Sequence, residues 1–162
     1  MTKPAIQLLV TDEGYRAIGH VAAQWAYLET ELDSLLSLFL EHDDVKQLGL
    51  ANAQSFKSRM SNLKEASELL LKDQEQPLKE IKGIITDASS LRGFRDDIVH
   101  GQWKLRRKGE NLSPGIRAIK SFPTYKTREM KFTYEKAEDV AVKISRVSVR
   151  VMGWRLKYVR FK

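Results

Sequence analysis

The sequence predicts an all-α fold, an antiparallel bundle of four to five helices in a single domain that spans residues 1–162. Apolar residues recur at spacings of three and four along several long segments, which is the pattern of a helix with one buried face. With 162 residues, 42% hydrophobic and 30% charged, the chain is long enough to bury one core. The pattern changes to alternation in the range 102–132, which predicts a short β-hairpin or loop inserted before the last helix.

The first predicted helix runs from about residue 11 to 41. Thr11 can cap it, and the acidic Asp12 and Glu13 suit the positive end of the helix dipole. A second helix is expected over about 53–72. The first helix would bury Ile18, Val21, Trp25, Leu28, Leu32, Leu35 and Phe39, and the second Phe56, Met60, Leu63 and Leu70.

The third predicted helix follows a turn at 73–77 and ends at Gly101, because glycine commonly terminates helices. The last helix begins after Thr133, again a residue suited to capping, and continues to about Tyr158. The third helix would bury Leu78, Ile81, Ile85, Ala88 and Leu91, and the last Val140, Ile144, Val147, Val151, Trp154 and Tyr158.

The composition excludes several classes of site. The absence of cysteine rules out disulfides, thiolate metal sites and cysteine nucleophiles. The three histidines (His20, His42 and His100) lack metal-ligand spacing, and no phosphate-binding loop occurs, so no metal or cofactor is expected. No apolar run approaches the roughly 20 residues needed to span a bilayer, and no signal peptide is evident at the N-terminus. We therefore expect a cytoplasmic protein without a membrane segment.

The net charge of +7 is distributed unevenly along the chain. Residues 1–100 carry 11 Lys/Arg and 16 Asp/Glu, whereas residues 101–162 carry 17 and 5. A basic half of this kind is typical of a surface that faces a polyanion, and nucleic acid is the commonest one. The alternative is a solvated basic face that only raises solubility. If the basic half binds RNA, we expect the contacts to come from Lys104, Arg106, Arg107 and Lys108, with Trp103 as a stacking face.

The segment 91–101 at the end of the third predicted helix carries the candidate site. Arg92 and Arg95 fall on the helix face that includes the apolar residues, where a charge is costly unless it is paired or used. Asp96 and His100 are one turn apart, so the carboxylate could orient the imidazole. Phosphodiester cleavage would use such a set. His100 would be the general acid and base, Arg95 would stabilise the developing charge, and Asp96 would orient His100.

A purely structural interpretation fits the same residues. Glu29 lies at the edge of the apolar stripe of the first helix, four residues after Trp25. A buried pair between Glu29 and Arg92 or Arg95 would satisfy the charges without catalysis. In that case His100 would be a simple helix cap.

The stretch from Arg95 to Gly101 resembles the signature of the HEPN superfamily, an arginine and a polar residue followed after a short gap by histidine. The order of elements is also similar, with Trp25 and Glu29 on a first helix and a final helix after a variable insertion. The resemblance implies a metal-independent endoribonuclease that acts in toxin–antitoxin, phage-defence or RNA-processing systems, with the site formed across a two-fold dimer. Asparagine is the more familiar residue after the arginine, whereas this chain has Asp96.

The resemblance also leaves a second function open. Other members of the superfamily are non-catalytic scaffolds or partners of an antitoxin or nucleotidyltransferase, so a dimerisation or binding module is the alternative. Gly93 lies one turn before the motif and is a poor helix former, by about 1 kcal/mol relative to alanine. We expect it to permit close approach of a second copy, so that two Arg95/His100 sets face one cleft of a homodimer.

Overall fold

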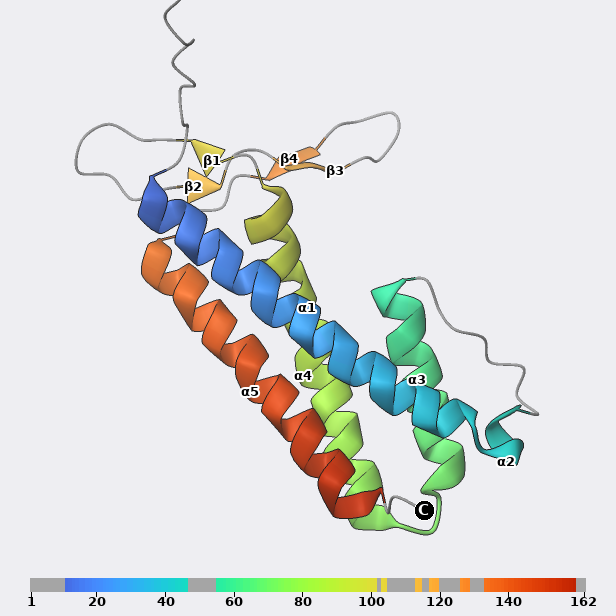
Figure 1. Ribbon diagram of the computed structural model, residues 1–162. Coiled ribbons are helices and arrows are strands. Elements are labelled where there is room, and N and C mark those ends of the chain that lie inside the picture. Colours follow the sequence, from blue (N-terminus) through green and yellow to red (C-terminus); the bar gives the residue numbers. More distant parts are fainter. Residues whose placement is uncertain are drawn as a thin grey trace, which may run out of the picture.

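The computed structural model describes residues 11–46, 55–101 and 133–159, and the backbone of four short strands between 103 and 128. Five α-helices form a helical bundle among the described residues (Figure 1). The all-α prediction is confirmed. The helices are α1 (Asp12–Leu40), α2 (Asp43–Lys46), α3 (Phe56–Leu70), α4 (Glu75–His100) and α5 (Tyr134–Tyr158).

Three of the long helices, α1, α3 and α5, begin with a side-chain cap. The sequence predicted the caps of α1 and α5. The hydroxyl of Thr11 accepts a hydrogen bond from the backbone N–H of Gly14, and the hydroxyl of Thr133 accepts one from Lys136. Ser55 caps α3 in the same way. The turn predicted at 73–77 is shorter than expected, because Pro77 lies within the first turn of α4. Proline is tolerated there, since first-turn N–H groups have no partner within the helix.

The helices are not arranged as a wholly antiparallel bundle. α1, α3 and α5 run in one direction, and α4 runs the opposite way between them (Figure 1). The parallel pairing of α1 with α5 is seen at both ends. Thr11 Oγ1 lies 2.5 Å from the hydroxyl of Tyr134, and the rings of Phe39 and Trp154 have centroids 5.8 Å apart. The predicted antiparallel arrangement is therefore wrong for α1 and α5. The direction of each helix depends on how the connection before it folds back, and helical periodicity does not encode that.

The core is drawn from all four long helices. Most of the apolar residues predicted to face inward are buried, whereas Ile18, Leu70, Leu78 and Tyr158 are half-buried at its margin. A buried charged residue joins two helices across the core edge, since Glu31 of α1 lies 3.4 Å from Arg155 of α5. The least exposed large side chains include Val21, Leu28, Leu63, Ile81, Ile98 and Ile144, each 0% exposed.

The strands are β1 (Trp103–Lys104), β2 (Ser113–Pro114), β3 (Arg117–Ile119) and β4 (Lys126–Arg128). β1 pairs with β2 and β3 with β4, both antiparallel. The sequence predicted one short β-hairpin or loop here, with the alternating segments 103–106 and 116–120 as the two strands of the hairpin. The described strands do not pair these two segments with each other. Alternation indicates extended backbone but does not select the partner. The side chains of Trp103, Lys104, Arg106, Arg107 and Lys108 lie outside the described residues.

None of the helices in the described part of the chain combines the length and the apolar character that a membrane span requires.

Candidate functional site

The end of α4 brings together the three residues predicted for catalysis. Nη1 of Arg95 lies 3.0 Å from Oδ1 of Asp96 and 2.9 Å from Nε2 of His100. An arginine can only donate hydrogen bonds, so Nε2 accepts and the contact fits a neutral imidazole protonated at Nδ1. His100 is exposed, whereas the side chains of Arg95 and Asp96 are 23% and 16% exposed. An accessible nitrogen base therefore sits directly beside a fixed cation.

The position of Asp96 differs from its predicted role. Its two oxygens are shared between two guanidinium groups, because Oδ1 binds Arg95 and Oδ2 lies 3.6 Å from Nε of Arg92. The hydrogen bond that orients His100 in the structure comes from Arg95. Asp96 therefore holds the two arginines together, and the imidazole is positioned by the nearer guanidinium.

Two aromatic rings from other helices support these arginines. The guanidinium of Arg95 lies over the ring of Trp25 on α1, 5.6 Å from its centroid, and that of Arg92 lies over Phe56 on α3 at 6.0 Å. The two rings contact each other at a centroid distance of 4.8 Å and an interplanar angle of 43°. Each cation–π contact contributes about 0.5–2 kcal/mol, depending on how far it is desolvated. We call Trp25 and Phe56 the aromatic pair.

The predicted pairing of Glu29 with Arg92 or Arg95 is wrong. Oε1 of Glu29 lies 2.5 Å from Nη2 of Arg59 on α3, and Nη1 of Arg59 lies 2.7 Å from Oδ2 of Asp33. Burial acts to lower the pKa of Arg59, but the attraction of Asp33 and then of Glu29 outweighs it and raises that pKa. The carboxylates of Glu29 and Asp33 on α1 thus bind Arg59 and link α1 to α3.

Arg59 is a residue that sequence reasoning missed. It lies three positions after Phe56, on the side of α3 that contacts α1, so the spacing of Phe56 and Arg59 was a readable signal. Its Nε and that of Arg95 are buried without a hydrogen-bond partner among the described residues. The Arg59 ion pairs and the Arg95 site are neighbours, since Glu29 binds Arg59, Trp25 lies under Arg95, and Trp25 and Glu29 are one turn apart on α1.

The helix ends at Gly101 without the left-handed conformation typical of a glycine cap. Gly101 has φ −67° and ψ 147°, an extended conformation that any residue can adopt. Gly93 is exposed, and a Cβ added there would meet nothing within 4 Å, while the adjacent Phe94 is 46% exposed. The surface beside the motif is open and partly apolar, and the role of Gly93 in dimer contact stays a prediction.

The described part of the chain contains no group of three or more His, Asp or Glu residues that could hold a metal ion. No family model, curated protein or solved structure matches the chain. The resemblance to the HEPN signature therefore rests on Arg95, Asp96 and His100 and on the order of the helices.

Proposed function

We propose that this protein is a HEPN-like, metal-independent endoribonuclease in which His100 is the general acid and base and Arg95 stabilises the charge on phosphorus. The single observation that supports this most strongly is the contact between Arg95 Nη1 and the Nε2 of an exposed His100 at 2.9 Å. A base and a cation at this spacing can contact one phosphodiester group together. The proposed setting is a toxin–antitoxin, phage-defence or RNA-processing system.

In the proposed reaction Arg95 acts first and His100 second. A phosphate oxygen competes with His100 for Arg95, because a charge-assisted hydrogen bond is stronger than one to a neutral imidazole. The freed Nε2 takes the proton of the ribose 2′-hydroxyl as the 2′-oxygen bonds to phosphorus. The bond from phosphorus to the 5′-oxygen then breaks, and the imidazolium returns its proton to that oxygen. The products are a 2′,3′-cyclic phosphate and a 5′-hydroxyl.

The aromatic pair suits this role because it fixes the guanidinium groups without neutralising them. Glu29 and Asp33 are engaged by Arg59, so they do not compete for Arg95. RNA as the substrate agrees with the excess of 12 positive charges in residues 101–162. A homodimer that joins two motifs is part of the same proposal, and the exposed Phe94 supports a contact there.

One observation favours a non-catalytic binding module for nucleic acid, an antitoxin or a nucleotidyltransferase partner. Asp96 places a carboxylate against both Arg92 and Arg95, where it would repel an incoming phosphate. On this second proposal the motif is an ion-pair network that shapes the end of α4 for a partner.

The test is cleavage of RNA by the full chain in EDTA, with His100→Ala as the variant and His20→Ala as the matched control. His20 is also exposed but lies on α1, 2.8 Å from Glu138. We expect wild type and His20→Ala to produce 2′,3′-cyclic phosphate ends, and His100→Ala to be slower by about 10²–10⁴-fold with an unchanged melting temperature. Equal cleavage by His100→Ala, or no cleavage of any RNA by the wild type, rejects the nuclease proposal. Failed cleavage together with dimer formation or RNA binding supports the module.

A further inference from the structure

α1 and α5 lie side by side along the bundle (Figure 1), and the outer side of this helix pair carries exposed apolar side chains. Six large hydrophobic side chains are exposed among the described residues, and five of them belong to this pair: Tyr15, Tyr27, Val142, Val149 and Leu156. Val149 and Leu156 are 62% and 70% exposed. Exposed apolar side chains that gather on one face mark an interaction site. We call this outer side the α1/α5 face.

The exposed apolar residues of α5 form a ridge, which we define as Val142, Val149 and Leu156. They are spaced by seven residues, so they lie within about 40° of one another around the helix. Residues at this spacing form the seam along which helices pair in coiled coils. Beside the ridge, the hydroxyl of Tyr27 on α1 donates a hydrogen bond to Sδ of Met152 at 3.1 Å. The apolar surface therefore continues from α5 onto α1.

α1 presents small residues next to the ridge. Its residues 17–28 include no aspartate, glutamate, lysine or arginine. Four exposed small residues lie about 100–160° around the helix from the buried Trp25. This small-residue stripe consists of Gly19, Ala23, Ala26 and Thr30. A Cβ added at Gly19 would meet nothing within 4 Å. The α1/α5 face thus has a raised row of branched side chains beside a low, uncharged one.

The charges around the face favour one way of covering it. Arg146 is exposed beside the ridge and makes no ion pair with another described residue, whereas Arg150 and Lys157 are bound to carboxylates of α4. At the end where the helices begin, His20 and Glu138 bind each other at 2.8 Å. α1 carries five acidic residues and one basic residue, and α5 carries three acidic and six basic. An α1 from another molecule therefore suits the surface of α5 better than a second α5 does.

We propose that two copies of this chain pair through the α1/α5 face, related by a two-fold axis parallel to the two helices. A surface in a two-fold contact must fit itself, and this rotation lays the ridge of each copy on the small-residue stripe of the other. The hydrogen bond of Thr11 with Tyr134 and the pair of Glu31 with Arg155 show that α1 and α5 are level along their length. Ridge and stripe therefore stay in register. Tyr27 becomes buried at the centre, where residues that dominate binding energy are found.

The face is large enough for a dimer. About 20 residues of each helix cover about 30 Å, and two packed helices are about 20 Å wide. Both copies together would bury about 1,200 Å², which is at the lower end of the range for specific interfaces. The contact is separate from the proposed nuclease site, because the stripe is turned away from Trp25, the ring that contacts Arg95. If a contact beside the motif forms as well, four copies assemble.

Sedimentation velocity of the full chain tests the proposal with the same substitution at two exposed helical glycines. Neither Gly19 nor Gly93 has an atom within 4 Å of an added Cβ, so the monomer tolerates a larger side chain at both. Gly19→Leu fills the stripe and should raise the dissociation constant of the dimer at least about 30-fold. Gly93→Leu, beside the motif, should leave this contact intact. A wild type that is monomeric at about 100 µM, or a dimer that only Gly93→Leu dissociates, overturns the proposal.

A second set of variants locates the contact. Val149→Lys at the centre of the ridge should give a monomer, whereas Ser61→Lys adds the same charge at an exposed position of α3 and should leave the dimer unchanged. Because the chain has no cysteine, Ala26→Cys chains can be mixed with Val149→Cys chains and oxidised mildly. The two different chains should be joined faster than either is joined to itself. Unchanged assembly in folded Val149→Lys, or faster joining of Val149→Cys chains to one another, rejects the arrangement.

Discussion

The two ends of the bundle use aromatic rings in different ways. At the His100 end the chain supplies its own cations, because Arg92 and Arg95 lie over the rings of Phe56 and Trp25. At the other end Phe39 and Trp154 pack edge to face at 5.8 Å and are 5% and 3% exposed, and the basic side chains in the last turn of α5, Arg155 and Lys157, are held by Glu31 and Glu80. The comparison shows that aromatic rings at a helix end can either hold an arginine of the same chain or pack against one another. Which outcome occurs depends on where the neighbouring carboxylates direct the arginines and lysines.

The largest expected effect on stability concerns Arg59, which connects α1 to α3 beside the aromatic pair. Arg59→Met should destabilise the fold by about 3 kcal/mol, since it leaves Glu29 and Asp33 without their cation. The exposed Arg16→Met on α1 is the control and should change stability little. Urea denaturation measures both.

A rescue experiment separates lost packing from unpaired charge at this position. Adding Glu29→Gln and Asp33→Asn to Arg59→Met should recover part of the lost stability, because no carboxylate is then left unpaired. A loss below about 0.5 kcal/mol in Arg59→Met, typical of a screened surface pair, would contradict the role given to this network.

The next effect compares the same substitution at the two ends. Trp154→Phe leaves the carbonyl of Pro77 without its donor and should cost about 1 kcal/mol more than Trp25→Phe. Both variants lose a similar ring volume, and Trp25 makes no indole hydrogen bond to another described residue. The difference between their free energies of unfolding therefore isolates the hydrogen bond. A larger loss in Trp25→Phe would instead show that the contact with Arg95 dominates.

The smallest expected effect is a dependence of stability on pH through Glu80, near the start of α4. Hydrogen bonds from Gln76 first, then from Lys157 and Tyr158, lower the pKa of Glu80 below its ordinary value of 4.5. A carboxyl with a lowered pKa stabilises the fold above the unfolded value, and this contribution is lost as the pH falls through the folded pKa. Glu80→Gln should therefore reduce the melting temperature at pH 7 and have little effect at pH 3. The exposed Glu65→Gln is the control, and an equal change at both pH values would contradict the assignment.

The helices were predictable because their signals are local. The spacing of Val21, Trp25 and Leu28 identifies a buried face, and Thr11 and Thr133 mark helix starts. The same holds for the candidate site, where Arg95 and His100 lie close enough along one helix to meet. Each of these inferences needs only the geometry of a single element.

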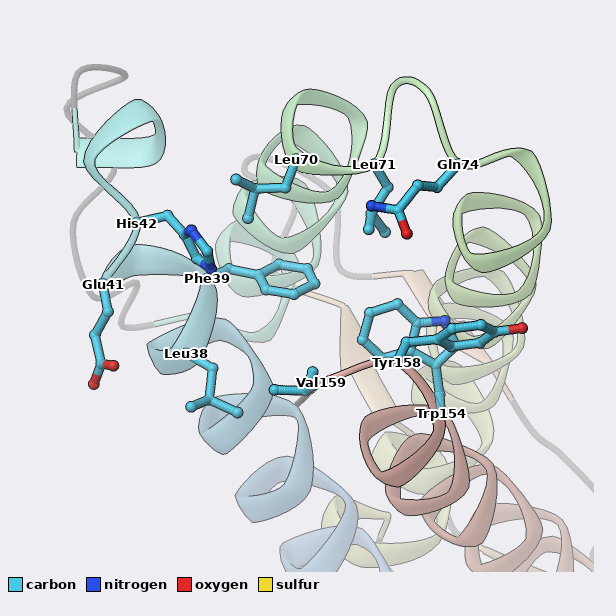
Figure 2. A pocket seen from close by; sticks show the side chains of 10 residues that line it. All are labelled: Leu38, Phe39, Glu41, His42, Leu70, Leu71, Gln74, Trp154, Tyr158 and Val159. Atoms are coloured by element: carbon cyan, nitrogen blue, oxygen red, sulfur yellow. The ribbon is translucent and has the colours of Figure 1, made fainter. Parts of the chain in front are cut away.

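What the sequence could not reveal is which element lies beside which. Glu29 was assigned to Arg92 or Arg95, but Arg59 is on a helix that lies closer to it. The parallel course of α1 and α5 and the pairing of β1 with β2 depend on how connections fold back, which periodicity does not record. The pocket at the end of the bundle where α4 begins (Figure 2) was missed for the same reason, since its lining comes from three helices, α1, α3 and α5, and from residues that flank them.

The pairing of α1 with α5 also affects how the chain reaches its fold. Thr11 and Tyr134 meet although 123 positions separate them, and Trp154 completes the core around Phe39. During synthesis the buried stripe of α1 is made well before α5, which packs against it. The part of the α1 apolar face that α5 covers therefore stays exposed until α5 has emerged, a situation that slows folding and favours aggregation of partly made chains. Docking of α5 is the step that ends this exposure.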